Sequence, residues 1–176
     1  VREMRGVLAL FEGVATGAAD GYARMADKPA AVLLHLGPGL GNGLANLHNA
    51  RKGHTPVVNI VGDHATYHKQ YDAQLESDIE TVARNVSTWL RTSASVEEVA
   101  ADAADAVAVA SGPPAQIATL ILPADVSWSE GGVPAAPVAP AQPAPVDADA
   151  VAAIAAVLQG DEPAALFVGG RACRAD

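Results

Sequence analysis

Glu12 is the acidic residue whose place in the sequence best suits proton transfer. It follows the apolar run 7–11, which predicts a short buried strand, and it opens a run rich in Ala and Gly that predicts a helix over residues 12–25. Ligands gather at the carboxyl ends of strands in open α/β sheets, and apolar neighbours there can raise the pKa of a carboxylate. Position alone favours an ordinary first-turn acid, because strand-to-helix junctions often carry one.

A glycine-rich segment, residues 37–42, lies between a predicted strand at 30–36 and a predicted helix at 43–50. We expect an irregular turn there, whose exposed backbone amides could hold an anion or a flat ring. It is neither a Walker loop, since no Lys-Ser/Thr pair follows, nor a dinucleotide fingerprint. Glycine turns are often only turns, so the segment leaves both interpretations open.

Three histidines lie close to these segments. His35 is the penultimate residue of the predicted strand 30–36, where a lone histidine is more often a core residue than a catalyst, but its place beside the glycine-rich turn makes it a candidate for proton transfer. His64 and His68 are four residues apart in a polar loop over residues 63–76. A metal site there is conceivable, but solvated loop side chains are the favoured interpretation.

The remaining pattern indicates the fold class. The other predicted elements are strands at 56–61, 86–90 and 117–122 and helices at 78–84 and 96–110. Ser95 and Glu98 form a capping box before the last of these helices. Strands that alternate with helices predict an α/β fold of three layers, a parallel sheet flanked by helices on both faces.

The character of the sequence changes after residue 130. Residues 131–146 are rich in Pro and Ala and predict a semi-rigid linker between a first domain, 1–130, and the beginning of a second α/β domain, 147–176. In the second domain, Asp147 is expected to cap a helix, and residues 164–168 predict a strand. Because the chain opens without Met and stops just after a strand, we expect a fragment in which both domains are truncated.

Composition limits the partners and the location. The formal net charge is -9, which argues against nucleic acid and against anionic membranes. No apolar run approaches the length of a membrane span. Cys173 is the single cysteine, so an intrachain disulfide or a cysteine-cluster metal site is excluded. We expect a cytoplasmic protein.

Several motifs occur in an order that is typical of one enzyme family. They are Leu10-Phe11-Glu12-Gly13, Asp20-Gly21-Tyr22-Ala23-Arg24, Gly37-Pro38-Gly39 with Asn42, and residues 56–62. They resemble the N-terminal pyrimidine-binding domain of thiamine-diphosphate-dependent enzymes, and the match runs in order from residue 10 to about residue 123. The resemblance is greatest to acetolactate synthase large subunits, and His35 resembles a proton-transferring histidine of benzoylformate decarboxylases.

The resemblance implies a role for individual residues. Glu12 would share a proton with the aminopyrimidine ring of thiamine diphosphate and so activate the cofactor, which reverses the preference for a simple first-turn acid. The cofactor contacts would be Glu12, Gly37, Pro38, Gly39 and Asn42. Gln74, within a stretch that resembles a family segment near the substrate, would lie close to a 2-oxo acid. The reaction would be decarboxylation or acetolactate-synthase-like carboligation.

The resemblance also implies what this chain lacks. In that family the diphosphate and Mg²⁺ are held by a separate domain through a Gly-Asp-Gly motif with a later Asn, and this sequence has no such motif. The active site would then lie between subunits of a homodimer or homotetramer, and the isolated fragment would be inactive. Two alternatives remain: a non-catalytic relative that pairs with a catalytic subunit, and an unrelated nucleotide-binding α/β module.

Overall fold

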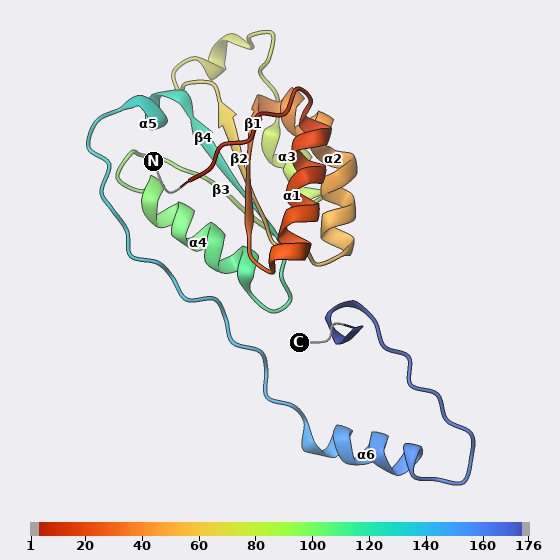
Figure 1. Cartoon of the computed structure of the whole chain (residues 1–176). Coiled ribbons are helices and arrows are strands. Elements are labelled where there is room, and N and C mark those ends of the chain that lie inside the picture. Colours follow the sequence, from red (N-terminus) through yellow and green to blue (C-terminus); the bar gives the residue numbers. More distant parts are fainter. Residues whose placement is uncertain (1–3, 174–176) are drawn as a thin grey trace. The chain divides into compact units, whose positions relative to one another are not determined.

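The computed structural model describes residues 4–173, which fall into two compact units divided between residues 141 and 142. The first unit contains the sheet, and the second contains the helix α6 (Ala148–Leu158) and the short 3-10 helix η2 (Gly170–Cys173) (Figure 1). The division lies inside the segment predicted to be a linker. Asp147 caps α6 as expected, because its carboxylate accepts a hydrogen bond from the backbone N–H of Asp149 at 2.9 Å.

The described part of the first unit is built on a parallel sheet of four strands. They are β1 (Ala30–His35), β2 (Val57–Asp63), β3 (Trp89–Thr92) and β4 (Ile117–Pro123), in the spatial order β1-β2-β4-β3. Every pairing is parallel, so the prediction from alternating strands and helices is confirmed. The two central strands are almost continuously buried, as expected for strands covered on both faces.

Helices cover the two faces unequally. The helices α1 (Glu12–Ala26), α2 (Leu36–Lys52) and α3 (Ile79–Arg84) pack on one face, and α4 (Val99–Ser111) packs on the other (Figure 1). Alternate residues of β2 serve the two sides, with Val57 in the larger apolar cluster and Val58 in the smaller one. The three-layer α/β fold predicted from the sequence is therefore confirmed.

The contact between α1 and α2 is close at Gly43 and Thr16. A Cβ atom on Gly43 would lie 2.8 Å from the Cγ2 atom of Thr16, so the helices could not approach as they do with any larger residue at position 43. The hydroxyl of Thr16 donates to the backbone carbonyl of Gly43 at 3.1 Å. This contact brings the beginning of α1 alongside the beginning of α2.

The predicted glycine-rich turn is wrong, because α2 begins at Leu36 and contains residues 37–42. Leu36 has a φ of 52°, a left-handed conformation that is rare outside glycine and that turns the chain directly from β1 into the helix. Pro38 is tolerated because it lies in the first turn, where its missing N–H has no helical acceptor. Tertiary packing overrides the low helix propensity of the glycines.

Two predicted strands do not form. Residues 7–11 belong to no sheet, although the N-cap residue Phe11 has an extended backbone, and residues 164–168 have no regular structure. A strand needs a neighbour with which to share hydrogen bonds, and the described residues bring none to either segment. Because of this, Glu12 follows no strand and is the first residue of α1.

Smaller boundaries also differ from the predictions. β3 lies three residues later than its predicted start, at Trp89. The capping box is wrong: α4 begins at Val99 after Glu98, whose side chain caps nothing, and Ser95 hydrogen-bonds to Glu97. The helix α5 (Ala124–Trp128) follows β4 directly. Among residues 4–173, none of the helices combines the length and the apolar character that crossing a bilayer requires.

Substitution of Gly37 by Ala tests the packing that holds residues 37–42 in α2. The new Cβ atom would lie 2.7 Å from the Cβ atom of Ser77, and so the loop before α3 would have to move. We expect Gly37→Ala to lower the free energy of unfolding by about 1–3 kcal/mol in urea denaturation. Gly41→Ala is the matched control: nothing lies within 4 Å of its added Cβ, and helix propensity should raise stability by about 0.5–1 kcal/mol.

A second substitution identifies the cause of the loss. Ser77→Gly removes the atoms that the new methyl group meets, so it should restore part of the stability of Gly37→Ala. Equal stabilities of the Gly37→Ala and Gly41→Ala variants would contradict this account of the packing.

Candidate active site

Glu12 lies where the first turns of α1 and α2 meet. It is half-buried, and its carboxylate oxygen Oε2 accepts a hydrogen bond from the side-chain amide of Asn42 at 3.1 Å. Among the described residues, no other side chain donates to this carboxylate. The predicted position at a strand end is wrong, but the close contact of the two helices still fixes the carboxyl group in place.

Hydrogen bonds set the charge of this carboxylate. The backbone N–H of Glu12 itself, and then the Asn42 amide, hold the pKa of Glu12 below its ordinary value. Burial acts in the opposite direction and the charge of His35 acts in the same direction, each with a smaller effect. The prediction of a raised pKa is therefore wrong for this chain, because donors to the ionised form outweigh desolvation.

His35 and Gly39 lie beside the carboxylate. His35 is the last residue of β1, is exposed and directly precedes α2. A Cβ atom on Gly39 would lie 3.4 Å from the Oε1 atom of Glu12 and 3.5 Å from the Cβ atom of His35. The missing side chain of Gly39 thus leaves the Oε1 side of the carboxylate uncrowded.

The predicted site residues therefore divide into two groups. The structure brings together Glu12, His35, Gly39 and Asn42, although they come from three elements. Gly37 is buried against Ser77, and Pro38 is exposed next to it. Gln74 is an exposed loop residue, and no side-chain hydrogen bond joins it to the rest of the described chain.

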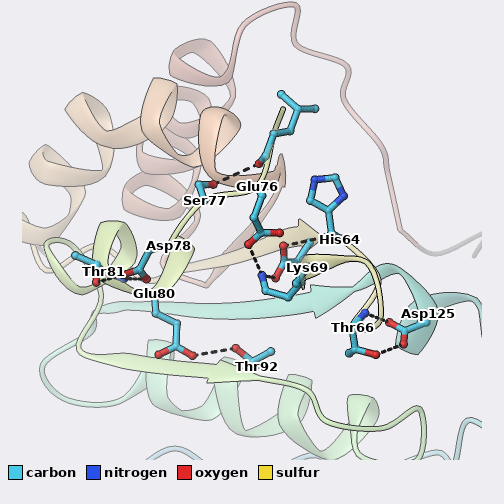
Figure 2. A network of polar contacts seen from close by, with 12 residues as sticks. His64, Thr66, Lys69, Glu76, Ser77, Asp78, Glu80, Thr81, Thr92 and Asp125 are labelled. Atoms are coloured by element: carbon cyan, nitrogen blue, oxygen red, sulfur yellow. Dashed lines mark hydrogen bonds and ion pairs between the residues drawn. The ribbon is translucent and has the colours of Figure 1, made fainter. Parts of the chain in front are cut away.

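A polar network in the loop after β2 was not predicted. The ammonium group of Lys69, in the 3-10 helix η1 (Lys69–Tyr71), lies 2.7 Å from Oδ2 of Asp63 and 2.8 Å from Oε1 of Glu76. Figure 2 shows Lys69 reaching towards Glu76, with His64 above them. Only Asp63, at the carboxyl end of β2, could have been found from the sequence, because the other two partners meet through the path of the loop.

The network lines a cavity of about 510 Å³ at the carboxyl ends of β2 and β4. Its other lining residues include Ser77, which packs against Gly37 and so links the cavity wall to the start of α2. Five carboxylates and one lysine line it, so its walls are acidic. Other residues of the loop, and not Gln74, thus form the polar lining of this cavity.

His64 and His68 form an aromatic contact. Their ring centroids are 5.2 Å apart, and the ring of Tyr71 lies 5.6 Å from that of His68. Within residues 4–173, no group of three or more His, Cys, Asp or Glu side chains has an arrangement that could hold a metal ion. The described structure therefore assigns these histidines to ring packing along the loop.

Comparisons with known proteins identify the family. Residues 1–84 match the family described as the N-terminal TPP-binding domain of thiamine pyrophosphate enzymes. The chain carries the N-terminal domain of the thiamine-diphosphate-dependent enzyme family. The resemblance stated from the motifs is thus confirmed.

Relatives and solved structures agree with this assignment. The chain is 63% identical, over 99% of its own length, to a proposed acetolactate synthase large subunit, IlvX, of Mycobacterium tuberculosis, and covers 33% of that protein. It is 32% identical, over 86% of its length, to the benzoylformate decarboxylase of Pseudomonas aeruginosa, and covers 26% of it. A crystal structure of a proposed thiamin diphosphate-dependent enzyme from Mycobacterium smegmatis matches 86% of the chain and 30% of that structure, with a TM-score of 0.80 and 32% identity.

Replacing Lys69 by Met tests the polar network. The side chains of Asp63 and Glu76 are only 5% and 14% exposed, so their charges would remain nearly buried without a cation. Lys69 itself is 42% exposed, and solvent screening reduces the loss. We expect the free energy of unfolding at pH 7 to fall by about 1–3 kcal/mol in urea denaturation. The control Lys52→Met should change it by less than about 0.5 kcal/mol.

The stability difference between the Lys69→Met variant and the wild type should depend on pH in a direction that the Lys69 pKa determines. Burial alone would lower the pKa of Lys69, but its hydrogen bonds to Asp63 and Glu76 outweigh burial and raise the pKa above the ordinary 10.5. The stabilisation is then complete below pH 10.5 and disappears as the pH rises through the folded-state pKa. A Lys69→Met variant as stable as Lys52→Met at pH 7 would contradict a stabilising network.

Proposed function

We propose that the intact protein is a thiamine-diphosphate-dependent enzyme that acts on 2-oxo acids, with Glu12 as the carboxylate that activates the cofactor. The observation that carries the proposal is the meeting of Glu12, His35 and Gly39 at the adjoining ends of α1, β1 and α2. The chain spans a quarter to a third of the length of the two curated relatives named above. Activity and substrate therefore belong to the whole protein.

The residues of the site fit an aminopyrimidine ring. Glu12 offers a half-buried carboxylate, and the absence of a side chain on Gly39 leaves its Oε1 side uncrowded. Glu12 and Gly39 would hold the ring, and Glu12 would give and take a proton at its carboxylate. When bound, thiamine diphosphate supplies an electron sink for cleavage of the bond between the carboxyl and carbonyl carbons of a 2-oxo acid. We place its diphosphate and Mg²⁺ on another part of the intact protein.

His35 favours decarboxylation over carboligation. An exposed imidazole beside Glu12 could exchange a proton with a bound substrate, which a hydroxyl or aliphatic residue at this position would do less well. The similarity to a benzoylformate decarboxylase supports this choice. A substrate-proximal role for Gln74 stays a prediction. A non-catalytic relative would have no need of Glu12, so the presence of Glu12 supports an active enzyme.

We further propose that the active site is completed by a second chain in a homodimer or homotetramer. Large apolar side chains near the start of α1 are uncovered, including Leu8, Leu10, Phe11 and Val14, and Leu33 of β1 is 76% exposed. An apolar surface of this kind is typical of a protein interface. A cytoplasmic location stays a prediction that rests on the single cysteine.

Glu12→Gln tests the central assignment. Glutamine keeps the shape of the side chain but cannot exchange a proton, so kcat for CO₂ release should fall by about 10²–10⁴-fold. The assay follows the intact protein with pyruvate and with benzoylformate, with thiamine diphosphate and Mg²⁺ added or withheld. Glu130→Gln, at an exposed acid, is the control and should retain full turnover.

The outcomes of this assay separate the hypotheses. Cofactor-dependent turnover that survives Glu12→Gln would remove the role of Glu12. A folded protein that binds thiamine diphosphate but releases CO₂ from neither acid would favour the non-catalytic relative.

His35→Ala tests the choice between reaction types. Because His35 is exposed, its loss should leave the fold intact while kcat for CO₂ release from benzoylformate falls by about 10²-fold or more. His48→Ala is the control, since His48 is an exposed histidine of the same helix. Equal rates for the two variants would argue against proton transfer by His35.

A further inference from the structure

We propose that Asn42 is a positioning residue for Glu12 rather than a contact of the cofactor. Its side-chain amide occupies one oxygen of the Glu12 carboxylate and leaves the other free for proton exchange. The catalytic consequence rests on the proposed function, whereas the coupling between the two side chains is a property of this chain alone.

The beginning of α1 is held by two amides from one face of α2. Asn42 and Asn46 are one helical turn apart, and both donate towards α1. Nδ2 of Asn46 lies 2.6 Å from the backbone carbonyl oxygen of Gly13, and Nδ2 of Asn42 lies 3.1 Å from Oε2 of Glu12. One amide therefore fixes the backbone of the first turn, and the other fixes the carboxylate that this turn carries.

The backbone does not depend on Asn42. Thr16 donates to the carbonyl of Gly43, and Asn46 donates to the carbonyl of Gly13, so the two helices are joined by two hydrogen bonds that do not involve Asn42. Asn42 itself is exposed and fills no space in the core. Its removal should therefore release the Glu12 side chain without loosening the fold.

The two oxygens of Glu12 have different surroundings. Oε2 accepts from Asn42, whereas Oε1 faces Gly39, where even a methyl group would lie 3.4 Å away. An amide NH₂ group can only donate to a carboxylate, so Asn42 restricts which oxygen remains available. The Asn42 amide is neutral, so it holds the Glu12 carboxylate without placing a positive charge beside it. A lysine at this position would add such a charge.

Few charged groups surround Glu12, so a change in its pKa can be traced to a single substitution. Among the described residues, His35 at the end of β1 is the one titratable group whose charge acts on Glu12, while α1 and α2 contribute uncharged donors. Substitutions at position 42 therefore change the environment of Glu12 by a single, known amount of charge or hydrogen bonding.

The experiment measures the pKa of Glu12 by ¹³C NMR of the protein labelled with ¹³C at its glutamate side chains. The Glu12 resonance is assigned as the one that disappears in the Glu12→Gln variant. We expect the pKa to rise from wild type to Asn42→Ala, because the donor to the ionised form is lost, and to rise further in Asn42→Asp, because a second carboxylate is added. Asn42→Gln, which keeps an amide, should restore part of the wild-type value. Asn49→Ala, an exposed asparagine of the same helix, is the matched control and should leave it unchanged.

A structural role alone would give a different pattern. Urea denaturation should show the same midpoint for Asn42→Ala and Asn49→Ala, whereas Asn46→Ala, which loses the bond to the backbone of Gly13, should unfold at lower urea. A pKa of Glu12 that is unmoved in both Asn42→Ala and Asn42→Asp would overturn the proposal.

Activity and binding then locate the effect within the site. In the intact protein, Asn42→Ala should lower kcat by about 10- to 100-fold through misplacement of the carboxylate, with the Kd for thiamine diphosphate changed less than kcat. A weaker Kd with an unchanged kcat would make Asn42 a cofactor contact and would overturn the proposal. If wild type shows no cofactor-dependent turnover, the proposed function fails, and the expected order of Glu12 pKa values still supports the coupling.

Discussion

The contact between α1 and α2 is the constraint on which the candidate active site depends. It is possible because Gly43 has no side chain where Thr16 approaches, and because Thr16 and Asn46 supply the hydrogen bonds between the two helices. Glu12 lies at the end of this contact, so its carboxylate takes its position from helix packing and not from a strand. A methyl group on Gly43 would meet Thr16 and force the two helices to shift.

The first unit treats its partly buried carboxylates in two ways. Glu12 is held by neutral donors, its own backbone N–H and the Asn42 amide, which keep it ionised but leave one oxygen uncrowded. Asp63 and Glu76 are instead paired with the ammonium group of Lys69, and these ion pairs join the two ends of the loop after β2. Both arrangements stabilise the charged carboxylate, but only that of Glu12 leaves one oxygen beside open space.

The sheet places the Glu12 site and the Lys69 network at the same edge. β1 and β2 are neighbouring parallel strands, so His35 and the segment from Gly62 to Asp63 lie at the same edge. The strained turn at Leu36 then sends the chain straight into α2, which carries Gly39 and Asn42 past the carboxylate. Gly37, packed on Ser77, joins this turn to the loop that contains Lys69 and Glu76. A single short segment thus connects both polar centres.

The sequence by itself determined the alternation of strands and helices, the parallel sheet that follows from it, and the family, because periodicity and ordered motifs are local properties of the chain. It also identified Glu12, His35, Gly39 and Asn42 as residues of interest. It failed where partners distant in the chain decide the outcome. Residues 7–11 have the composition of a strand but no neighbour to pair with, and residues 37–42 have the composition of a turn but are packed into a helix. The Asn42 amide, which adds to the effect of the Glu12 backbone N–H in lowering the pKa of Glu12, comes from thirty residues away, and the Lys69 network depends on the path of a loop. Only tertiary structure can set such features, since it brings together groups that the sequence keeps apart.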